Sequence, residues 1–217
     1  MSKKNIFILL GGTWHDFDGF AAAMKSLLEG AGYRVQITDD PDALTHLNEL
    51  GCDLLLSYTC LTEPLVGETN KSPTKFSNAQ IDSLTSWVRS GRALLAAHAA
   101  TVVGASGPGL ERLLGGAFIR HPPQFNFKAI PLPAQHPITE GIEAFDVYDE
   151  LYIERYDSSV IIHMIAIYEQ VAYPVVWSRR EEQGRVAHIA LGHSQQVWDH
   201  EPYQHLMLQT IQWLIKS

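Results

Sequence analysis

The chain has 217 residues, a hydrophobic fraction of 46% and a formal net charge of −8. This length fits one domain over residues 1–217, and the hydrophobic fraction suffices for a packed core. An acidic chain without a prominent run of lysine and arginine disfavours a nucleic-acid partner. The apolar run from Ile6 to Leu10 is too short to span a bilayer or to form the core of a signal peptide. We therefore expect a soluble, cytoplasmic protein with neither a nucleic-acid nor a membrane partner.

The numbers and spacing of cysteines and histidines indicate which side chains could carry the chemistry of a functional site. The two cysteines, Cys52 and Cys60, have neither the number for a disulfide framework nor the spacing of zinc ligands. Their scarcity fits a reducing compartment. Ten histidines stand against sixteen lysines and arginines. Because histidine titrates near neutral pH and is the commonest metal ligand, we look for functional residues first among the histidines.

The first part of the chain alternates apolar runs with helical patterns. A continuous apolar run that ends in glycine is typical of a strand buried on both faces. The first helix is expected to be capped by Asp18 and to end near Leu28, before Gly30. The expected strands are 5–10, 33–38 and 52–58, and the expected helices are 18–28 and 41–50. This β-α-β-α-β order predicts parallel strands joined by right-handed crossovers.

The middle of the chain leads to an unusual turn. Residues 59–77 lack periodicity and are rich in Thr, Pro, Gly and Asn, as in a lid or a contact loop. Asn78 is expected to cap a helix that ends at Gly91. The buried strand 93–97 follows and runs into His98 and small residues. This form is that of a nucleophile elbow, in which a sharp turn exposes one side chain above the sheet, but here the side chain is an imidazole.

The second half of the chain has a different pattern. After a helical segment at 110–114, the expected strands are 125–132, 147–156, 160–168, 171–178 and 185–191. The last two flank the polar turn 179–184 and so resemble a β-hairpin, which could pair two subunits in a homodimer. Pro202 opens a final helix. We therefore predict an α/β fold with a mainly parallel central sheet and added antiparallel strands in the second half.

Three histidines follow strands of the predicted sheet. His15 comes after the first strand, His98 after the central one and His193 after the last long one. Because the carboxyl ends of parallel strands share one edge, these imidazoles are expected to converge there. Glu150, in an aromatic stretch, is their candidate carboxylate partner. We assign catalytic roles to His98, His193 and Glu150. His15 is expected to line the same pocket. The alternative is a hydrogen bond to the backbone for His98 and His193, packing of its loop for His15, and an outward-facing side chain for Glu150.

Other residues are candidates for contacts with a substrate. His121 and His136 lie beside prolines, so turn stabilisation is the alternative interpretation for both. Trp14, Tyr152 and Trp198 could stack on a sugar or only pack in the interior. Aromatic walls with a few convergent polar groups are what a small-molecule site generally requires.

The predicted cluster is compatible with two kinds of chemistry. Imidazoles and a carboxylate suit zinc or another divalent metal, and the candidate ligands are His15, His98, His193 and Glu150. A site assembled from several strands needs no tight local ligand spacing. Without a metal, the same groups could perform general acid–base catalysis. The sequence has neither a dinucleotide-binding G-x-G-x-x-G nor a Walker A motif, so no nucleotide cofactor is predicted.

Several short motifs together resemble one known family. In chain order they are the glycine turn with His15, His98-Ala99-Ala100-Thr101, Leu114-Gly115-Gly116-Ala117-Phe118 leading to His121-Pro122, His136-Pro137-Ile138-Thr139, Asp149-Glu150-Leu151-Tyr152, and Gly184-Arg185-Val186 leading to Leu191-Gly192-His193. Their order and spacing resemble the ThuA-like, or trehalose-utilisation, family over about Ile6 to Trp213.

The resemblance implies a fold similar to that of class I glutamine amidotransferases, a flavodoxin-like three-layer sandwich with extra strands. It does not imply their activity. His98 fills the place of their cysteine nucleophile, and Ser194-Gln195 follows His193 where they have Pro-Glu. Glutamine hydrolysis through a thioester needs an activated thiolate.

What the resemblance does imply is a small-molecule partner related to sugar utilisation, such as a disaccharide or its keto form. Two reactions suit the predicted cluster: isomerisation or elimination beside a carbonyl, and hydrolysis assisted by a bound metal. The alternative is a non-catalytic module that binds a sugar or a partner protein and has lost the elbow nucleophile.

Overall fold

The computed structural model describes residues 3–63 and 73–216, and its first half forms the alternating strands and helices expected from the sequence. The elements are β1 (Asn5–Gly12), α1 (Phe17–Gly30), β2 (Arg34–Thr38), the 3₁₀ helix η1 (Pro41–Thr45), β3 (Leu54–Cys60), α2 (Asn78–Arg89), β4 (Ala93–Ala97), the 3₁₀ turns η2 (His98–Thr101) and η3 (Gly104–Ser106), and α3 (Gly107–Leu114). Part of the predicted lid, residues 64–72, lies outside the described residues.

The second half is mostly strands. They are β5 (Gly116–Arg120), β6 (Phe125–Pro131), β7 (Phe145–Asp149), β8 (Ile153–Tyr156), β9 (Ile161–Tyr168), β10 (Val171–Glu181) and β11 (Gly184–Ile189), followed by α4 (Gln195–Trp198) and α5 (Glu201–Ile215). β10 and β11 form the predicted antiparallel hairpin.

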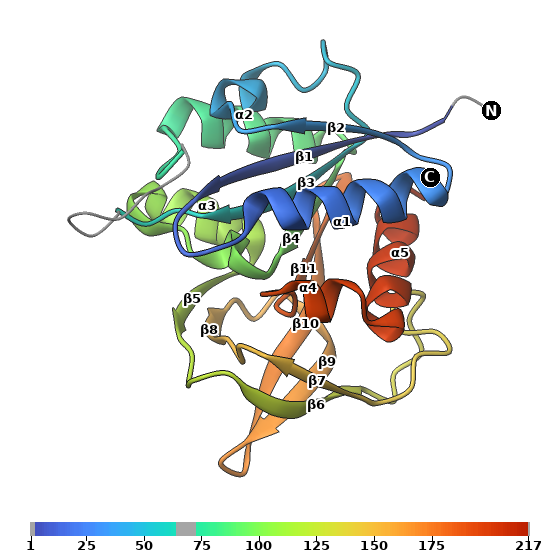
Figure 1. Ribbon diagram of the computed structural model, residues 1–217. Helices are drawn as coiled ribbons and strands as arrows, with labels where there is room; N and C mark the ends of the chain where they lie inside the picture. The colour runs from blue at the N-terminus through green and yellow to red at the C-terminus, as the bar shows by residue number, and fades with distance from the viewer. Residues whose placement is uncertain (1–2, 64–72, 217) are drawn as a thin grey trace.

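Among the described residues, nine strands form one sheet in the order β2-β1-β3-β4-β11-β10-β9-β6-β7 (Figure 1). The first five strands in this order pair in parallel. The pairings from β11 through β10, β9 and β6 to β7 are antiparallel. This confirms a large sheet whose parallel part is extended by antiparallel strands from the second half of the chain.

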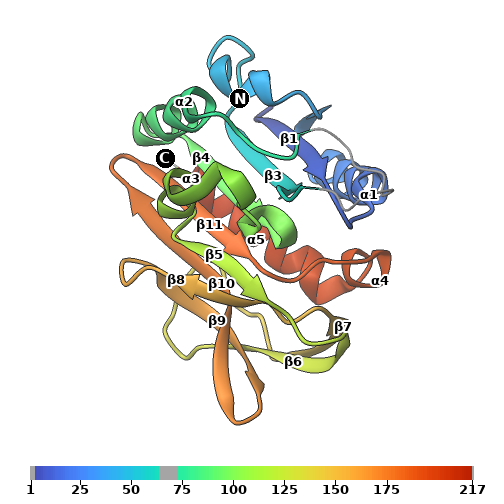
Figure 2. The same ribbon diagram turned by 90° about the vertical axis from the view of Figure 1, so that its left-hand side faces the viewer.

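Helices cover both faces of the parallel strands (Figure 2). Successive side chains of a strand point to opposite faces. Ile6 and Ile8 of β1 accordingly pack in the hydrophobic cluster that includes α1 and α5, whereas Phe7 and Leu9 pack in the cluster that includes α2 and α3. Full burial of one such side chain is worth about 1.5–3 kcal/mol. The strands are therefore firmly held, and their carboxyl ends form one edge on which a site can be built.

Three helical segments differ from the prediction. Asp16, not Asp18, caps α1 by accepting a hydrogen bond from the Gly19 N–H. Ser77, not Asn78, caps α2, in a capping box with Gln80. Each start offers two cap-forming residues close together, and the one just before the first helical residue is used. Only the first half of the helix expected at 41–50 forms, as η1.

The largest departure from the prediction lies at residues 147–156, where one strand was expected. The chain forms two strands instead: β7 pairs with β6, and β8 pairs with β5, a strand that was not predicted. Residues 150–152 link the two sheets. An apolar pattern does not show where a strand changes partner, because both halves remain half-buried. This break places Glu150 in the link, free of strand pairing.

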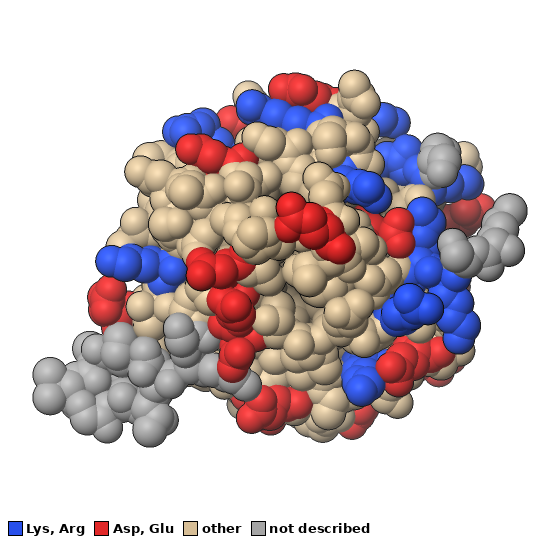
Figure 3. Space-filling view, turned by 90° about the horizontal axis from the view of Figure 1, so that it is seen from above, with Lys and Arg blue, Asp and Glu red and all other residues tan. Residues whose placement is uncertain are grey.

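Acidic and basic side chains are interspersed on the face shown in Figure 3, with basic ones densest at the margin near the amino end of the chain. That margin lies at the amino end of β1, opposite the edge where β1, β3, β4 and β11 end. No helix among the described residues is both long and apolar enough to cross a membrane.

Candidate functional site

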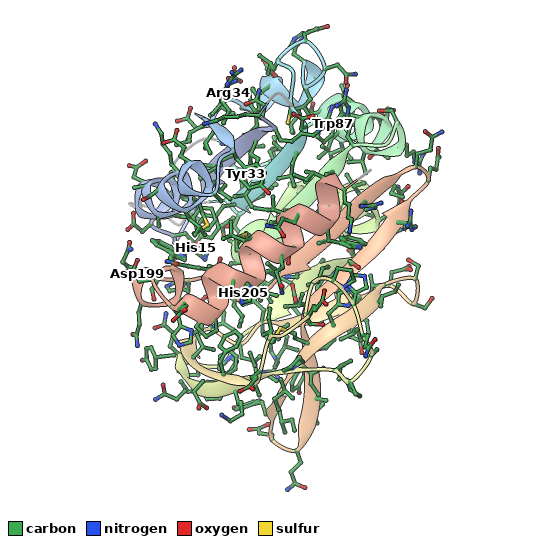
Figure 4. All side chains as sticks on the ribbon, turned by 90° about the vertical axis from the view of Figure 1, so that its right-hand side faces the viewer. His15, Tyr33, Arg34, Trp87, Asp199 and His205 are labelled. Carbon is green, nitrogen blue, oxygen red and sulfur yellow. The ribbon has the colours of Figure 1, made fainter. Side chains whose placement is uncertain are left out.

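Three imidazoles and one carboxylate converge where the parallel strands end. His15 follows β1, His98 follows β4, His193 follows β11 and Glu150 follows β7. One ligand atom from each side chain can be chosen so that all four atoms lie within 4.8 Å of one another. The ring centroid of His15 lies 5.1 Å from those of both His98 and His193. Figure 4 labels His15, which lies between α1 and α4. The predicted convergence of the three histidines is thus present.

His98 sits on a strained turn at the centre of this cluster. Its φ is 42°, a left-handed value that is uncommon for a residue other than glycine. The side chain is fully buried. Its Nδ1–H donates to the Ala190 carbonyl at 2.7 Å, which directs Nε2 toward Oε2 of Glu150 at 3.5 Å. The turn therefore presents the Nε2 edge of the ring to the centre of the cluster.

His15 is oriented in the same way. Its Nδ1–H donates to the Thr13 carbonyl at 2.9 Å, so Nε2 faces the cluster, 3.4 Å from the hydroxyl of Tyr152. Burial, together with the nearby His98, lowers the pKa of His15 to about 3. His15 is therefore a neutral imidazole at physiological pH, the form that can donate an electron pair to a metal ion.

Glu150 bridges the cluster. Its Oε2 lies 3.2 Å from Nδ1 of His193 and 3.5 Å from Nε2 of His98. Burial alone would raise the pKa of Glu150, but the neighbouring His193 and His98 lower it below its usual range. Burial lowers the pKa of His193, and Glu150 more than offsets this, so the pKa of His193 is raised. Glu150 is accordingly an ionised carboxylate in contact with two imidazoles.

The turn that bears His193 is held by a second carboxylate. Asp149 is almost fully buried and accepts hydrogen bonds from the N–H groups of Gly192 at 2.7 Å and His193 at 3.1 Å. Gly192 has a φ of 126°, and a Cβ on it would lie 2.8 Å from the Tyr203 hydroxyl. Only glycine fits this position without strain. The turn is thus fixed by its own sequence and by Asp149.

The donor set fits a divalent metal ion. Nε2 of His98 and Nδ1 of His193 are buried and have no hydrogen-bond partner within the described residues. Buried nitrogens of this kind normally find a partner, and both point toward Glu150. His15 and His98 each donate their other ring N–H to a backbone carbonyl, as metal-ligating histidines do. Ligand atoms around a four-coordinate zinc ion lie about 3.4 Å apart, given bonds of about 2.0–2.2 Å. Oε2 of Glu150 lies at similar distances from Nδ1 of His193, 3.2 Å, and from Nε2 of His98, 3.5 Å.

Three further predicted residues border the cluster. Tyr152 is buried, with its ring centroid 4.3 Å from that of His98. His121 is partly exposed, and its Nε2 lies 3.8 Å from Oε1 of Glu150. Trp14, next to His15, is 57% exposed and has a φ of 70°. His121 and Trp14 thus connect the buried cluster with the surface.

Two predicted residues lie elsewhere. His136, in the loop after β6, stacks on His163 with ring centroids 4.1 Å apart. Trp198 is fully buried and donates its indole N–H to the Gly192 carbonyl at 2.6 Å. Trp198 therefore supports the His193 turn from behind rather than forming a pocket wall. Its indole packs in the interior, against Phe20 and Tyr58.

The prediction gave no role to Asp149, although its neighbour Glu150 was chosen. The signal was available, because the period of two in β7 places Asp149 on the same inward face as Phe145 and Val147. A carboxylate at an inward position must find donors, and the backbone of the His193 turn supplies them.

Comparison with known proteins agrees with this geometry. The family model for ThuA, described as trehalose utilisation, matches residues 6–214. The chain belongs to the ThuA family. This confirms the resemblance carried by the six motifs. No curated protein sequence matches the chain.

Solved structures of ThuA-like proteins share the fold. One from Parabacteroides merdae ATCC 43184 has a TM-score of 0.80 at 15% identity, over 99% of this ThuA-family chain and 91% of that chain. One from Bacteroides uniformis ATCC 8492 has a TM-score of 0.73 at 16% identity, over 97% of this chain and 91% of that chain. The β-galactosidase of Rahnella sp. R3 has a TM-score of 0.65 at 12% identity, over 99% of this chain but 31% of its own length. At these identities the likeness concerns the fold alone.

Proposed function

We propose that this ThuA-family protein is an enzyme of carbohydrate utilisation that binds a divalent metal ion and acts on a sugar or keto-sugar. The metal ligands would be His15, His98, His193 and Glu150. The observation that carries the proposal is the pair of buried nitrogens on His98 and His193 that have no hydrogen bond within the described residues and that both face one carboxylate oxygen of Glu150. The family description, trehalose utilisation, supports the substrate class.

Zinc is the metal that we favour, because three imidazoles and a carboxylate suit it well. When bound, such an ion polarises a carbonyl or hydroxyl oxygen and lowers the pKa of a bound water. His98 has no exposed surface, so it cannot exchange a proton directly with a substrate outside the cluster. This burial favours a ligand role for His98 over the acid–base role that the sequence also permitted.

The partly exposed residues would receive the substrate. His121 lies beside Glu150, and because its Nδ1–H donates to the Pro122 carbonyl, its Nε2 is the atom that can hydrogen-bond to a sugar hydroxyl. Trp14 directly precedes His15 in the chain and is 57% exposed, and indole faces commonly pack against apolar faces of ligands. The reactions that suit this arrangement are isomerisation or elimination beside a carbonyl, and metal-assisted hydrolysis.

Glutamine hydrolysis is not part of this proposal. Burial raises the pKa of Cys52 to about 12 and also raises that of Cys60, so neither thiol is activated as a nucleophile. The amidotransferase-like, flavodoxin-like sandwich is proposed as the fold type. It is supported by the order β2-β1-β3-β4-β11 of the parallel strands, which corresponds to the doubly wound order 2-1-3-4-5. We also propose a cytoplasmic location.

The alternative function is a non-catalytic module that binds a sugar. One experiment separates the two. The protein is purified without added metal, analysed for bound metal, and assayed with trehalose, other disaccharides and their keto forms. His98→Gln and His193→Gln are compared with His205→Gln, a change on the exposed side of α5 (Figure 4).

The enzyme proposal predicts bound metal and turnover in the wild type and in His205→Gln, and loss of both in the two site variants. Sugar binding without any turnover in the wild type would instead support the module. Turnover that survives both site variants would contradict the roles assigned to His98 and His193.

A further inference from the structure

A second buried polar cluster lies beside the candidate metal site. Nε2 of His188 in β11 lies 3.3 Å from Oε2 of Glu154 in β8, and their side chains are 0% and 2% exposed. The hydroxyl of Thr101 donates to the other oxygen, Oε1, of Glu154 at 2.5 Å. No residue of this cluster was predicted to be functional. Yet a buried carboxylate is expensive to desolvate unless it is fully satisfied, so its position calls for a physical reason.

The cluster holds the His98 turn on both sides. Thr101 is the last residue of η2, the 3₁₀ turn that begins with His98. His188 donates its Nδ1–H to the carbonyl of Ala96, two residues before His98, at 3.0 Å. Glu154 contacts both Thr101 and His188. A single carboxylate therefore connects the backbone before the strained residue with the side chain at the end of the turn.

The same carboxylate also fixes the link that bears Glu150. This link runs from Asp149, the last residue of β7, to β8, which contains Glu154. At its first end, Asp149 accepts hydrogen bonds from the backbone of the His193 turn. At its other end, Glu154 is bound to the His98 turn. Glu150 thus lies between two buried carboxylates, each attached to the turn of a different candidate ligand.

We propose that Glu154 is a positioning residue: through Thr101 and His188 it holds His98 and Glu150 at the separation needed to share one metal ion. This inference rests on the proposed metal site and extends it to residues that touch neither the metal nor the substrate. Buried ion pairs add little stability compared with well-packed apolar residues. Residues outside the ligands can nevertheless change metal affinity about 10- to 100-fold by orienting them.

The test uses the intact protein and cobalt(II), whose visible absorption reports the ligand geometry. Thr101→Val removes the hydroxyl while keeping the shape of the side chain, and Thr101→Ser retains the hydroxyl. Glu154→Gln replaces the carboxylate with an uncharged amide. The control is Arg155→Gln, because Arg155 is the next residue of β8 and forms an exposed ion pair with Glu111. Cobalt affinity, the visible spectrum and the free energy of unfolding in urea are measured for each variant.

We expect Thr101→Val and Glu154→Gln to weaken cobalt binding about 10- to 100-fold and to change the visible bands, while Thr101→Ser and Arg155→Gln resemble the wild type. Cobalt affinity and bands that stay unchanged in Thr101→Val and Glu154→Gln would overturn the proposal, whatever happens to the free energy of unfolding. Such a result would leave Glu154 a structural residue only.

A wild type that binds no metal would contradict the proposed metal site instead. The positioning role of Glu154 would then be tested in the metal-free protein. The measurement is the tautomer of His98, determined from histidine ¹H–¹⁵N correlation spectra. A loss of the fixed Nδ1–H form in Thr101→Val, with its retention in Thr101→Ser, is the result that the positioning role predicts. An unchanged tautomer in both variants would overturn it.

Discussion

Nε2 of His98 lies 3.5 Å from Oε2 of Glu150, although the two residues come from different halves of the chain. His98 directly follows β4 of the parallel sheet, whereas Glu150 lies in the link between β7 and β8, which pair with different antiparallel partners. The antiparallel half therefore completes a site that the parallel half begins. The fold joins them because β11 pairs in parallel with β4 and antiparallel with β10.

Metal binding is expected to stabilise the protein against heat. At a free zinc concentration of about 100 times Kd, binding to the native state adds about 2.7 kcal/mol, or about 5–10 °C in Tm for a chain of this size. Glu150→Gln is expected to reduce this shift strongly, because it removes the charged ligand. A calorimetric scan with and without zinc measures it. An equal shift in the wild type and in Glu150→Gln would contradict a ligand role for Glu150.

Loss of the Asp149 carboxylate is expected to affect stability and the site together. Asp149→Asn replaces a carboxylate that accepts from the N–H groups of Gly192, His193 and Glu150 with an amide that can present a donor to one of them. The expected cost is about 1–3 kcal/mol in the free energy of unfolding, with weaker metal binding because the His193 turn is loosened. Asp146→Asn, at an exposed position of the same strand, serves as the control. Equal urea midpoints for the two variants would show that Asp149 does not hold the turn.

Most of the site could be predicted because parallel strands end at one edge. That rule alone placed His15, His98 and His193 together. Local sequence could not distinguish His121 from His136, since both lie beside prolines. His121 follows β5, which pairs with the strand after Glu150, whereas His136 lies in the distant loop after β6. The pairing of β5 with β8 is a long-range contact that no local pattern records.

The role of Trp198 was hidden for a similar reason. An aromatic residue near a histidine turn has the same sequence signal whether it lines a pocket or fills the space behind it. Trp198 packs against Phe20 and Tyr58, which come from α1 and β3. Only the packing of these distant elements decides that its indole is buried.

Stability is expected to fall in mild acid because of His163. Burial, together with the nearby His136, lowers the pKa of His163 to about 4. Unfolding returns it to about 6.5. Between these values the unfolded chain binds a proton that the native protein does not, so the free energy of unfolding decreases as the pH falls from about 6.5 to about 4. His163→Gln is expected to make this decrease shallower in urea titrations, whereas His205→Gln, which is exposed, should follow the wild type. The same slope in His163→Gln and the wild type would contradict this assignment.

Trp14 is expected to contribute to substrate binding and little to stability. It is 57% exposed, so Trp14→Ala should change the free energy of unfolding by no more than about 0.5 kcal/mol. Loss of one aromatic contact of about 1 kcal/mol corresponds to about fivefold weaker sugar binding. The measurement is KM and kcat for a sugar that the wild type converts, with Trp14→Phe as the variant that retains an aromatic face. An unchanged KM in Trp14→Ala would remove Trp14 from the substrate site.

The most direct test of the central claim is anomalous diffraction at the absorption edge of the bound metal, from crystals of protein purified without added metal. We expect one strong peak about 2.0–2.2 Å from Nε2 of His15, Nε2 of His98, Nδ1 of His193 and a carboxylate oxygen of Glu150. No peak among these four side chains, with ordered water bonded to the two buried nitrogens in its place, would contradict it.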